Sequence, residues 1–220
     1  MTNDQRRHER EHESRTPFKS RKNDVSMVDL DGQTAVLKRF ADPAAAMRER
    51  AMMDRAAAAG LAVPALLPAN AYEYVDAPTL AELLEQAEAR LTAGKSTLES
   101  ERGPLLDAWQ ALFKWLWNFH AATGLIMGDV NARNFLYGDG TLTGFDFEDA
   151  REGEIEEDVG RSLAFMMAYD PIESPLKQAL WTELTAWLET AGGLSLPLVT
   201  AYYGDERAAM RERRSGDAPC

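Results

Sequence analysis

The sequence predicts an α+β fold in which a small antiparallel sheet and one helix precede a larger, mainly helical region. Residues 27–30 and 33–40 have the composition of strands, and only the turn pair Asp31-Gly32 separates them. Large apolar side chains recur at helical spacing over residues 105–120 and 159–188. We therefore expect strands to dominate the first third of the chain and helices to dominate the rest.

The composition is that of a globular protein without a general nucleic-acid-binding surface. The 220 residues are 45% hydrophobic and 27% charged, which is enough to bury a sizeable core. The net charge of −12 argues against nucleic-acid binding, which needs a basic surface. No apolar run approaches the ~20 residues of a membrane span, and the charged N-terminus is not a signal peptide. Cys220 is the only cysteine, so no internal disulfide forms, and we expect a soluble, cytoplasmic protein.

Cap and turn residues delimit the N-terminal segments. Apart from the initial methionine, residues 1–16 contain no large apolar side chain, and they predict a disordered tail. Asp42 as cap and Pro43 at the first position predict a helix that stops at Gly60. Residues 71–75 predict a further strand.

The second half of the chain carries helix signals around one short hairpin. Thr79 and Glu82 predict a capping box at a helix start, and residues 92–104 predict a polar loop. The residues between 134 and 147 predict two short strands. The long helix after the loop is expected to turn an aromatic stripe toward the core, made of Leu105, Leu106, Trp109, Leu112, Phe113, Leu116, Trp117 and His120.

Spacing excludes a phosphate-binding loop of the P-loop type. Gly94-Lys95-Ser96 looks like the end of that motif. The motif needs another glycine five residues earlier, after a buried strand, so that backbone N–H groups can wrap the phosphates. Ala89 stands at that position within a predicted helix. We therefore interpret Gly94 as a helix stop and Lys95 as a loop lysine.

A second pattern carries the chemistry. Asp129 is followed by Asn134, then by a short predicted hairpin, and then by Asp146 at the end of an apolar strand. Phosphoryl transfer needs one carboxylate at the acceptor hydroxyl, and it needs an amide oxygen and a second carboxylate to hold Mg²⁺ against the nucleotide phosphates. The spacing Asp-x₄-Asn is weak evidence alone, but the preceding helix and the following hairpin occur in the order that this chemistry requires.

Other residues fall where a nucleotide site would need them. Lys38 lies near the end of a strand and could reach the first two phosphates, and Glu49 on the next helix could orient it by pairing. The segment from Glu73 to Val75 could bond the adenine edge through its backbone. Asp158 could support the loop that carries Asp129. Each residue alone has a purely structural explanation, but their shared order and spacing favour the functional one.

On these motifs, residues 18–190 resemble the protein-kinase-like superfamily, and above all its small atypical members. These members include the RIO-type and tRNA-threonylcarbamoylation-complex kinases, the lipopolysaccharide-core sugar kinases, and the aminoglycoside and choline phosphotransferases. The resemblance implies a bilobal protein-kinase-like fold, with a reduced N-terminal sheet lobe at 17–76, a helical C-terminal lobe at 77–205 and a polar tail at 206–220. The implied roles are the catalytic carboxylate for Asp129, metal ligands for Asn134 and Asp146, nucleotide orientation for Lys38 and Glu49, and a hinge for Glu73 to Val75.

The chain also departs from the superfamily pattern. No glycine precedes Gly32, so the glycine-rich loop is missing, and residues 18–24 supply either substitute cations or part of the flexible tail. Met127 stands where the family usually has His, and Glu148 replaces the glycine of the Asp-Phe-Gly element. The short stretch between Asp146 and Asp158 leaves no room for an activation loop, which argues against a regulated signalling kinase.

We therefore expect a phosphotransferase that depends on ATP and Mg²⁺ and phosphorylates a hydroxyl of a small molecule, sugar or protein. The alternative is a pseudokinase that serves as a nucleotide-binding or scaffold module, which the missing glycines favour. A third interpretation is an acidic helical interaction domain with chance motif matches, and a protein partner remains compatible with each.

The acceptor is the least defined part of this expectation. Eight carboxylates and only one base, Arg151, occur between Asp146 and Asp158. This acidic run is either a solvated loop or a surface that attracts a cationic acceptor, because a cleft with charge of one sign concentrates ions of the other.

Overall fold

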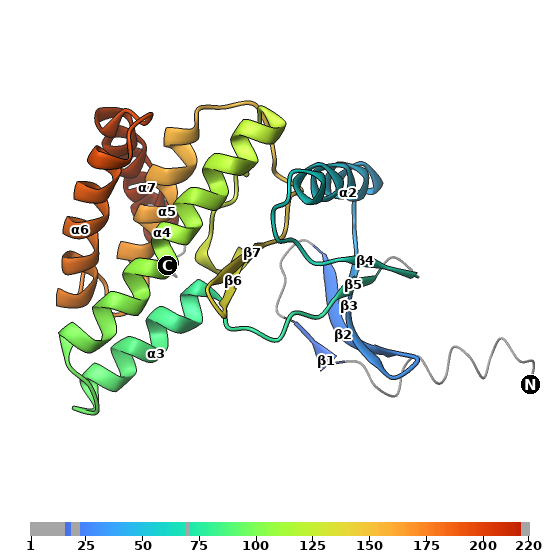
Figure 1. The fold of residues 1–220 in the computed structure, drawn as a ribbon, viewed down its shortest axis with the longest axis horizontal. Coiled ribbons are helices and arrows are strands. Elements are labelled where there is room, and N and C mark those ends of the chain that lie inside the picture. The colour runs from blue at the N-terminus through green and yellow to red at the C-terminus, as the bar shows by residue number, and fades with distance from the viewer. Residues whose placement is uncertain (1–15, 19–22, 69–70, 217–220) are drawn as a thin grey trace, which may run out of the picture.

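The computed structural model describes residues 16–18, 23–68 and 71–216. A five-stranded sheet with one helix forms one side of the molecule, a group of helices forms the other, and a two-stranded hairpin lies between them (Figure 1). The α+β, two-lobed architecture predicted from the sequence is confirmed. Most of the expected tail lies outside the described residues, although Thr16 already belongs to the first strand. No helix of these described segments is long and apolar enough to cross a membrane.

The sheet is antiparallel throughout. Its strands are β1 (Thr16–Pro17), β2 (Asp24–Leu30), β3 (Gln33–Arg39), β4 (Leu66–Leu67) and β5 (Ala71–Glu73), in the order β1-β2-β3-β5-β4. Asp31 and Gly32 have φ angles of 54° and 86°, which is the left-handed pair that a two-residue hairpin turn requires. The predicted hairpin of β2 and β3 is confirmed, and it places Lys38 beside Val25 in the register.

Helix α2 (Pro43–Ala58) follows the hairpin directly. The Asp42 side chain accepts a hydrogen bond from the Ala44 N–H, and Pro43 opens the helix, so the predicted helix start is confirmed. Glu49 is among the residues that α2 buries. A buried charged residue needs a partner of opposite charge, and for Glu49 this partner is Lys38, which belongs to the candidate site.

The helices of the other side are α3 (Leu80–Thr92), α4 (Leu98–Thr123), α5 (Ile155–Ala168), α6 (Pro175–Ala191) and α7 (Leu196–Gly216). Between α4 and α5 lie a short 3₁₀ turn, η2 (Ala132–Asn134), and the hairpin of β6 (Phe135–Gly138) and β7 (Thr141–Gly144). The capping box of Thr79 and Glu82 is present as predicted.

The core lies around α4, and its aromatic stripe is largely confirmed. Trp109, Leu112 and Leu116 have no exposed surface. Trp117 is the exception, because it is 37% exposed, and Trp115 is buried instead. A helix advances 100° per residue, so Trp117 lies at the border of the face that Leu112 and Leu116 define.

Trp115 joins three parts of the chain. Its ring packs against Phe119, against Phe135 next to η2, and against Phe147 after β7. Its indole N–H donates to the carbonyl of Ala62, which lies between α2 and β4. The sheet side and the hairpin are thus both fixed to the central helix.

The loop predicted over residues 92–104 is wrong in its second half, because α4 begins at Leu98. Thr97 and Ser100 form a hydroxyl-based capping box there, although Glu or Gln is more usual than Ser at the third helical position of that motif. Glu101 is buried and receives two hydrogen bonds from Arg90 of α3. These contacts hold the first turns of α4 in place despite Pro104 within the helix.

Two further boundaries differ from the expectation. The region predicted as helical over residues 159–188 contains two helices. The first ends at Ala168, because two prolines follow, and Ser174 caps the second by accepting from the Lys177 N–H. The polar tail expected from residue 206 is helical as far as Gly216, since α7 buries Glu206 and Met210 against the rest of the molecule.

Candidate functional site

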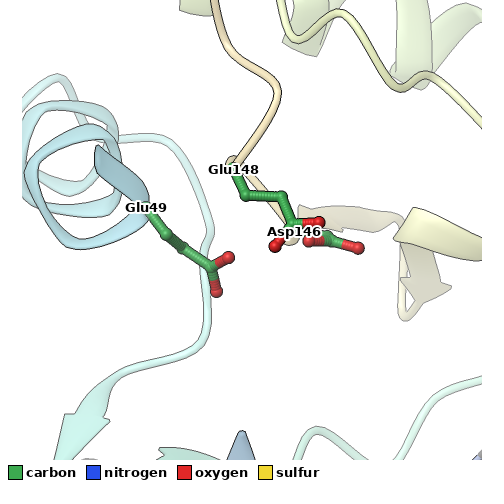
Figure 2. A group of neighbouring side chains, drawn as sticks. All are labelled: Glu49, Asp146 and Glu148. Atoms are coloured by element: carbon green, nitrogen blue, oxygen red, sulfur yellow. The ribbon is translucent and has the colours of Figure 1, made fainter. Parts of the chain in front are cut away.

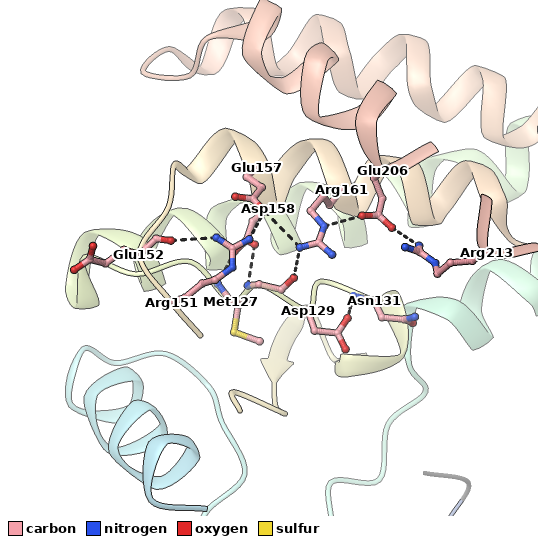
Figure 3. Close-up of polar contacts among 11 residues, drawn as sticks. Met127, Asp129, Asn131, Arg151, Glu152, Glu157, Asp158, Arg161, Glu206 and Arg213 are labelled. Atoms are coloured by element: carbon pink, nitrogen blue, oxygen red, sulfur yellow. Dashed lines mark hydrogen bonds and ion pairs between the residues drawn. The ribbon is translucent and has the colours of Figure 1, made fainter. Parts of the chain in front are cut away.

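The loop after α4 carries Asp129 in a constrained backbone. Gly128 has a φ of +76°, and a Cβ there would lie 2.4 Å from the carbonyl oxygen of Asp149, so only glycine fits. Asp158 is fully buried and accepts hydrogen bonds from the N–H groups of Met127 (2.7 Å) and Gly128 (3.1 Å) (Figure 3). Asp158 therefore holds the loop on α5, in the supporting position that the sequence suggested.

Asp129 itself is half-buried beside two amide side chains. Its Oδ1 accepts from the Asn131 N–H at 3.3 Å, and its backbone carbonyl accepts from Asn134 Nδ2 at 3.1 Å. Burial raises the pKa of Asp129; the Asn131 and Asn134 hydrogen bonds oppose this shift, whereas the charges of Asp146 and Asp149 add to it. A carboxylate with a raised pKa is a better proton acceptor.

A second cluster gathers around Lys38. Its Nζ lies 2.5 Å from Glu49 Oε2, 2.6 Å from Asp146 Oδ1 and 3.8 Å from Glu148 Oε2. Figure 2 shows the three carboxylates, which come from α2 and from the segment after β7 and approach one common space. One oxygen of each lies within 4.8 Å of the others. The structure thus brings Lys38, Glu49 and Asp146 together across 108 residues of sequence.

The electrostatics of this cluster follow from three acids around one base. Burial raises the pKa of Glu49 to about 7, and the ion pair with Lys38 only partly offsets this shift. Burial lowers the pKa of Lys38, but the charges of Asp146 and Glu49 and the hydrogen bonds to both outweigh that effect, so the net shift is upward. Lys38 is therefore a permanent cation at the centre of the cluster.

Asp146 is held in an unusual backbone conformation. Its φ is +69°, in the left-handed region that few residues other than glycine adopt. Such strain persists where the surrounding structure fixes it, and functional sites are a common location. The side chain is 31% exposed, so one carboxylate oxygen pairs with Lys38 while the residue still reaches solvent.

The predicted hinge residues lie where the sheet connects to the helices. Glu73 ends β5, and Val75 lies in the connection to α3, which also contains the expected lobe boundary at residue 76. The Glu73 N–H donates to the carbonyl of Ala65, and the Val75 carbonyl accepts from Ala77. These two backbone groups are therefore engaged within the chain.

Several residues of the site were not singled out for a role from the sequence. Asn23, at the start of β2, donates to Glu148 at 2.8 Å, and Arg161 donates to the Gly128 carbonyl at 2.6 Å. The Tyr169 hydroxyl donates to Asn131 at 2.6 Å. Each pair is more than thirty residues apart, so no local motif signals it. Lys19, Arg21 and Lys22, which could either replace a glycine-rich loop or belong to the tail, lie outside the described residues.

A two-lobed fold with a lysine–glutamate pair and an Asp-x₄-Asn loop defines a protein-kinase-like protein. The chain belongs to the phosphotransferase enzyme family, whose sequence model matches residues 75–192, more than half of the chain. It is thus a phosphotransferase, as the sequence predicted, and the protein-kinase-like superfamily is confirmed. No curated protein matches the chain.

Two solved structures illustrate the shared fold. Amicoumacin kinase, in complex with AMP-PNP, Ca²⁺ and its antibiotic, is 15% identical over 88% of this chain and 79% of that chain, with a TM-score of 0.54. A thermostable mutant of aminoglycoside phosphotransferase APH(4)-Ia, in a ternary complex with ADP and hygromycin B, is 13% identical over 100% of both chains, also with a TM-score of 0.54. Neither comparison supports the pseudokinase alternative.

Proposed function

We propose that the protein transfers the terminal phosphoryl group of ATP, with Mg²⁺, to a hydroxyl of a small molecule. The observation that carries this proposal is the pairing of Lys38 with both Glu49 and Asp146 next to the loop of Asp129. Phosphoryl transfer depends on positioning and charge neutralisation, and this arrangement supplies a fixed cation and carboxylates within one site.

Each residue has a separate task in this proposal. Lys38 binds the phosphates of the nucleotide, and Glu49 holds Lys38 in place through the 2.5 Å pair. Asp129 orients the acceptor hydroxyl and receives its proton, for which its raised pKa suits it. The backbone from Glu73 to Val75 contacts the edge of the base, apart from the Glu73 N–H and the Val75 carbonyl, which are engaged within the chain.

The donor groups fit a magnesium ion. Mg²⁺ prefers carboxylate and amide oxygens and keeps several waters, and Asn134 and Asp146 offer such oxygens on either side of the β6–β7 hairpin. The Phe145 N–H donates to the Asn134 carbonyl at 3.1 Å. This hydrogen bond keeps Asn134 next to the residue that precedes Asp146. When bound there, the ion would neutralise charge on the phosphates. The nucleotide complexes of amicoumacin kinase and of APH(4)-Ia support the choice of nucleotide.

The first test compares the contribution of Lys38 to ATP binding with that of Lys95, the lysine of the rejected P-loop motif. Lys38→Met should weaken ATP binding by about tenfold or more, since a hydrogen bond to a charged group contributes roughly 1.5–3 kcal/mol. The matched control Lys95→Met changes an exposed loop lysine and should leave affinity unchanged. Calorimetric titration with ATP and Mg²⁺ measures both. Wild-type affinity in Lys38→Met, or a loss in Lys95→Met, would contradict the assignment.

We propose that the acceptor carries positive charge. Fewer carboxylates of the acidic run support this proposal than the sequence suggested. Most of that run is used within the protein, because Glu154 accepts from Tyr202, Glu156 accepts from the Ser195 N–H and Glu157 pairs with Arg151. Asp149, also in this run, lies close enough to Asp129 for its charge to act on that carboxyl. The support for a cationic acceptor is therefore the pair of Asp129 and Asp149.

A panel of cationic and anionic hydroxyl compounds, assayed for ATP consumption at low and high salt, tests this part. We expect cationic compounds to be preferred, and we expect Asp149→Asn to raise their KM by severalfold at low salt, since salt screens such attraction. Glu154→Gln is the control, because its carboxylate is engaged with Tyr202. Preference for anionic acceptors, or equal effects of the two variants, would refute the idea.

A further inference from the structure

Arg161 contacts the backbone immediately before Asp129. It lies on α5, three residues after Asp158, and its Nη1 donates to the Gly128 carbonyl at 2.6 Å (Figure 3). Asp158 holds the two peptide groups that precede Gly128, whereas Arg161 holds the peptide group that joins Gly128 to Asp129. Arg161 is therefore the last contact before the proposed catalytic carboxylate.

That contact matters because the peptide group before Asp129 follows a glycine, Gly128. Glycine has no Cβ and can adopt many combinations of φ and ψ, so nothing in its own side chain fixes the peptide that follows. A rotation of this peptide would carry Asp129 with it. Displacements of about 1 Å can cost on the order of a hundredfold in rate, so the hydrogen bond from Arg161 has a direct effect on positioning.

The orientation of Arg161 depends on two carboxylates. Its Nη1 lies 3.5 Å from Glu157 Oε1 within α5, and a second, shorter contact reaches the C-terminal helix. Its Nε donates to Glu206 Oε2 at 3.0 Å, and Glu206 is only 7% exposed. A guanidinium is planar with donors in a fixed fork, so a carboxylate that holds Nε also sets the direction of Nη1. Arg213, whose side chain is 60% exposed, pairs with the other oxygen of Glu206 at 2.6 Å.

Close packing fixes α7 relative to α5. A Cβ at Gly160 would lie 2.5 Å from the carbonyl oxygen of Val199 and 2.9 Å from the Cβ of Tyr202, so the two helices approach as closely as glycine permits. Helix α7 lies wholly outside residues 75–192, where the family model matches. The contact between Glu206 and Arg161 therefore lies partly outside the matched region.

We infer that Glu206 and Arg161 are positioning residues, through which α7 sets the location of Asp129 during phosphoryl transfer. The inference rests on the proposed function, because it takes Asp129 as the group that meets the acceptor. Neither residue touches the reacting atoms. Their effect should therefore be on kcat, through the loop, and not on nucleotide binding.

The test compares three substitutions of similar shape: Arg161→Met, Glu206→Met and the control Arg213→Met. With ATP and Mg²⁺, and with water or the best compound of the panel as acceptor, Arg161→Met should lower kcat by about tenfold or more while the KM for ATP stays within about twofold. Glu206→Met should have a smaller effect in the same direction, and Arg213→Met should change kcat by less than about twofold. The double variant of Arg161 and Glu206 should be no slower than Arg161→Met, because one residue acts through the other.

Hydrogen exchange of the amides at residues 127–131 gives a readout that does not need activity. Exchange should accelerate in Arg161→Met and Glu206→Met but not in Arg213→Met. If the wild-type protein consumes no ATP, the proposed function fails, and exchange still decides whether the loop is held from α7. Unchanged exchange and kcat in Arg161→Met, or equal effects of Glu206→Met and Arg213→Met, would overturn the inference. If Arg161→Met does not fold, Arg161→Lys keeps the charge without the fork and should show the same loss of kcat at an unchanged melting temperature.

Discussion

Asp129→Asn is expected to lower the rate of phosphoryl transfer by about a thousandfold while ATP affinity stays within about twofold. The amide keeps the shape of the side chain but cannot take a proton from the acceptor hydroxyl. In the proposed arrangement Asp129 meets the acceptor, whereas Lys38 pairs with Glu49 and Asp146 and binds the nucleotide. Single-turnover assays and calorimetric titration with ATP and Mg²⁺ measure the two quantities separately.

Asp146→Asn is the control for this prediction. It removes a charge next to Lys38 and one of the proposed metal ligands, so it should weaken the Mg²⁺ dependence of nucleotide binding. The two variants therefore differ in which measurement they change. If Asp129→Asn and Asp146→Asn gave the same pattern of binding and turnover, the assignment of their roles would be wrong.

Asp158→Ala is expected to lower the free energy of unfolding by about 2–6 kcal/mol, because two buried N–H groups lose their acceptor at about 1–3 kcal/mol each. The groups are those of Met127 and Gly128, and the carboxylate between them has no exposed surface. Urea denaturation measures the loss. Glu152→Ala, at an exposed position nearby, serves as the control and should cost little.

The same residue should give stability a defined pH dependence. Burial raises the pKa of Asp158 to about 6, although the N–H groups of Met127 and Gly128 and the charge of Arg161 oppose the shift and Glu157 adds to it. An unfolded aspartate titrates near 3.9. The folded chain thus binds the proton more tightly, so the contribution of this group is complete below about pH 4 and is lost as the pH rises through about 6.

The difference in stability between wild type and Asp158→Asn isolates this contribution from that of Glu49. It should change by about 2 kcal/mol between pH 4 and pH 6.5, in the direction of relatively lower wild-type stability at the higher pH. A difference that stays constant over this range would mean that Asp158 is ionised throughout.

The parts of the molecule that the sequence predicted are those that short segments determine. The turn at Asp31-Gly32, the start of α2 at Pro43 and the capping box at Thr79 all depend on neighbours within four residues. The Asp-x₄-Asn spacing is equally local, and it led to Asp129 and Asn134. No local pattern predicts that Lys38 and Asp146 lie close together. That expectation came from the resemblance to the superfamily, which has its elements in the same order.

The missed features depend on partners that are distant in sequence. Helix α4 starts early because Glu101 is buried against Arg90, and α7 continues because Glu206 meets Arg161. Nothing near Glu206 in the sequence distinguishes it from the charged residues around it. A polar segment is normally predicted to be exposed. Only the structure shows that one of its charged side chains is buried against an opposite charge.

The carbonyl of Ala62 affects how the sheet can move relative to the helices. It accepts from the indole N–H of Trp115 and also from the Gly144 N–H, both at 3.2 Å. Ala62 follows α2, which carries Glu49, and Gly144 lies two residues before Asp146. A single carbonyl therefore ties the segment after α2 both to α4 and to the end of β7, which restrains movement of the sheet relative to the helices on the side of Trp115.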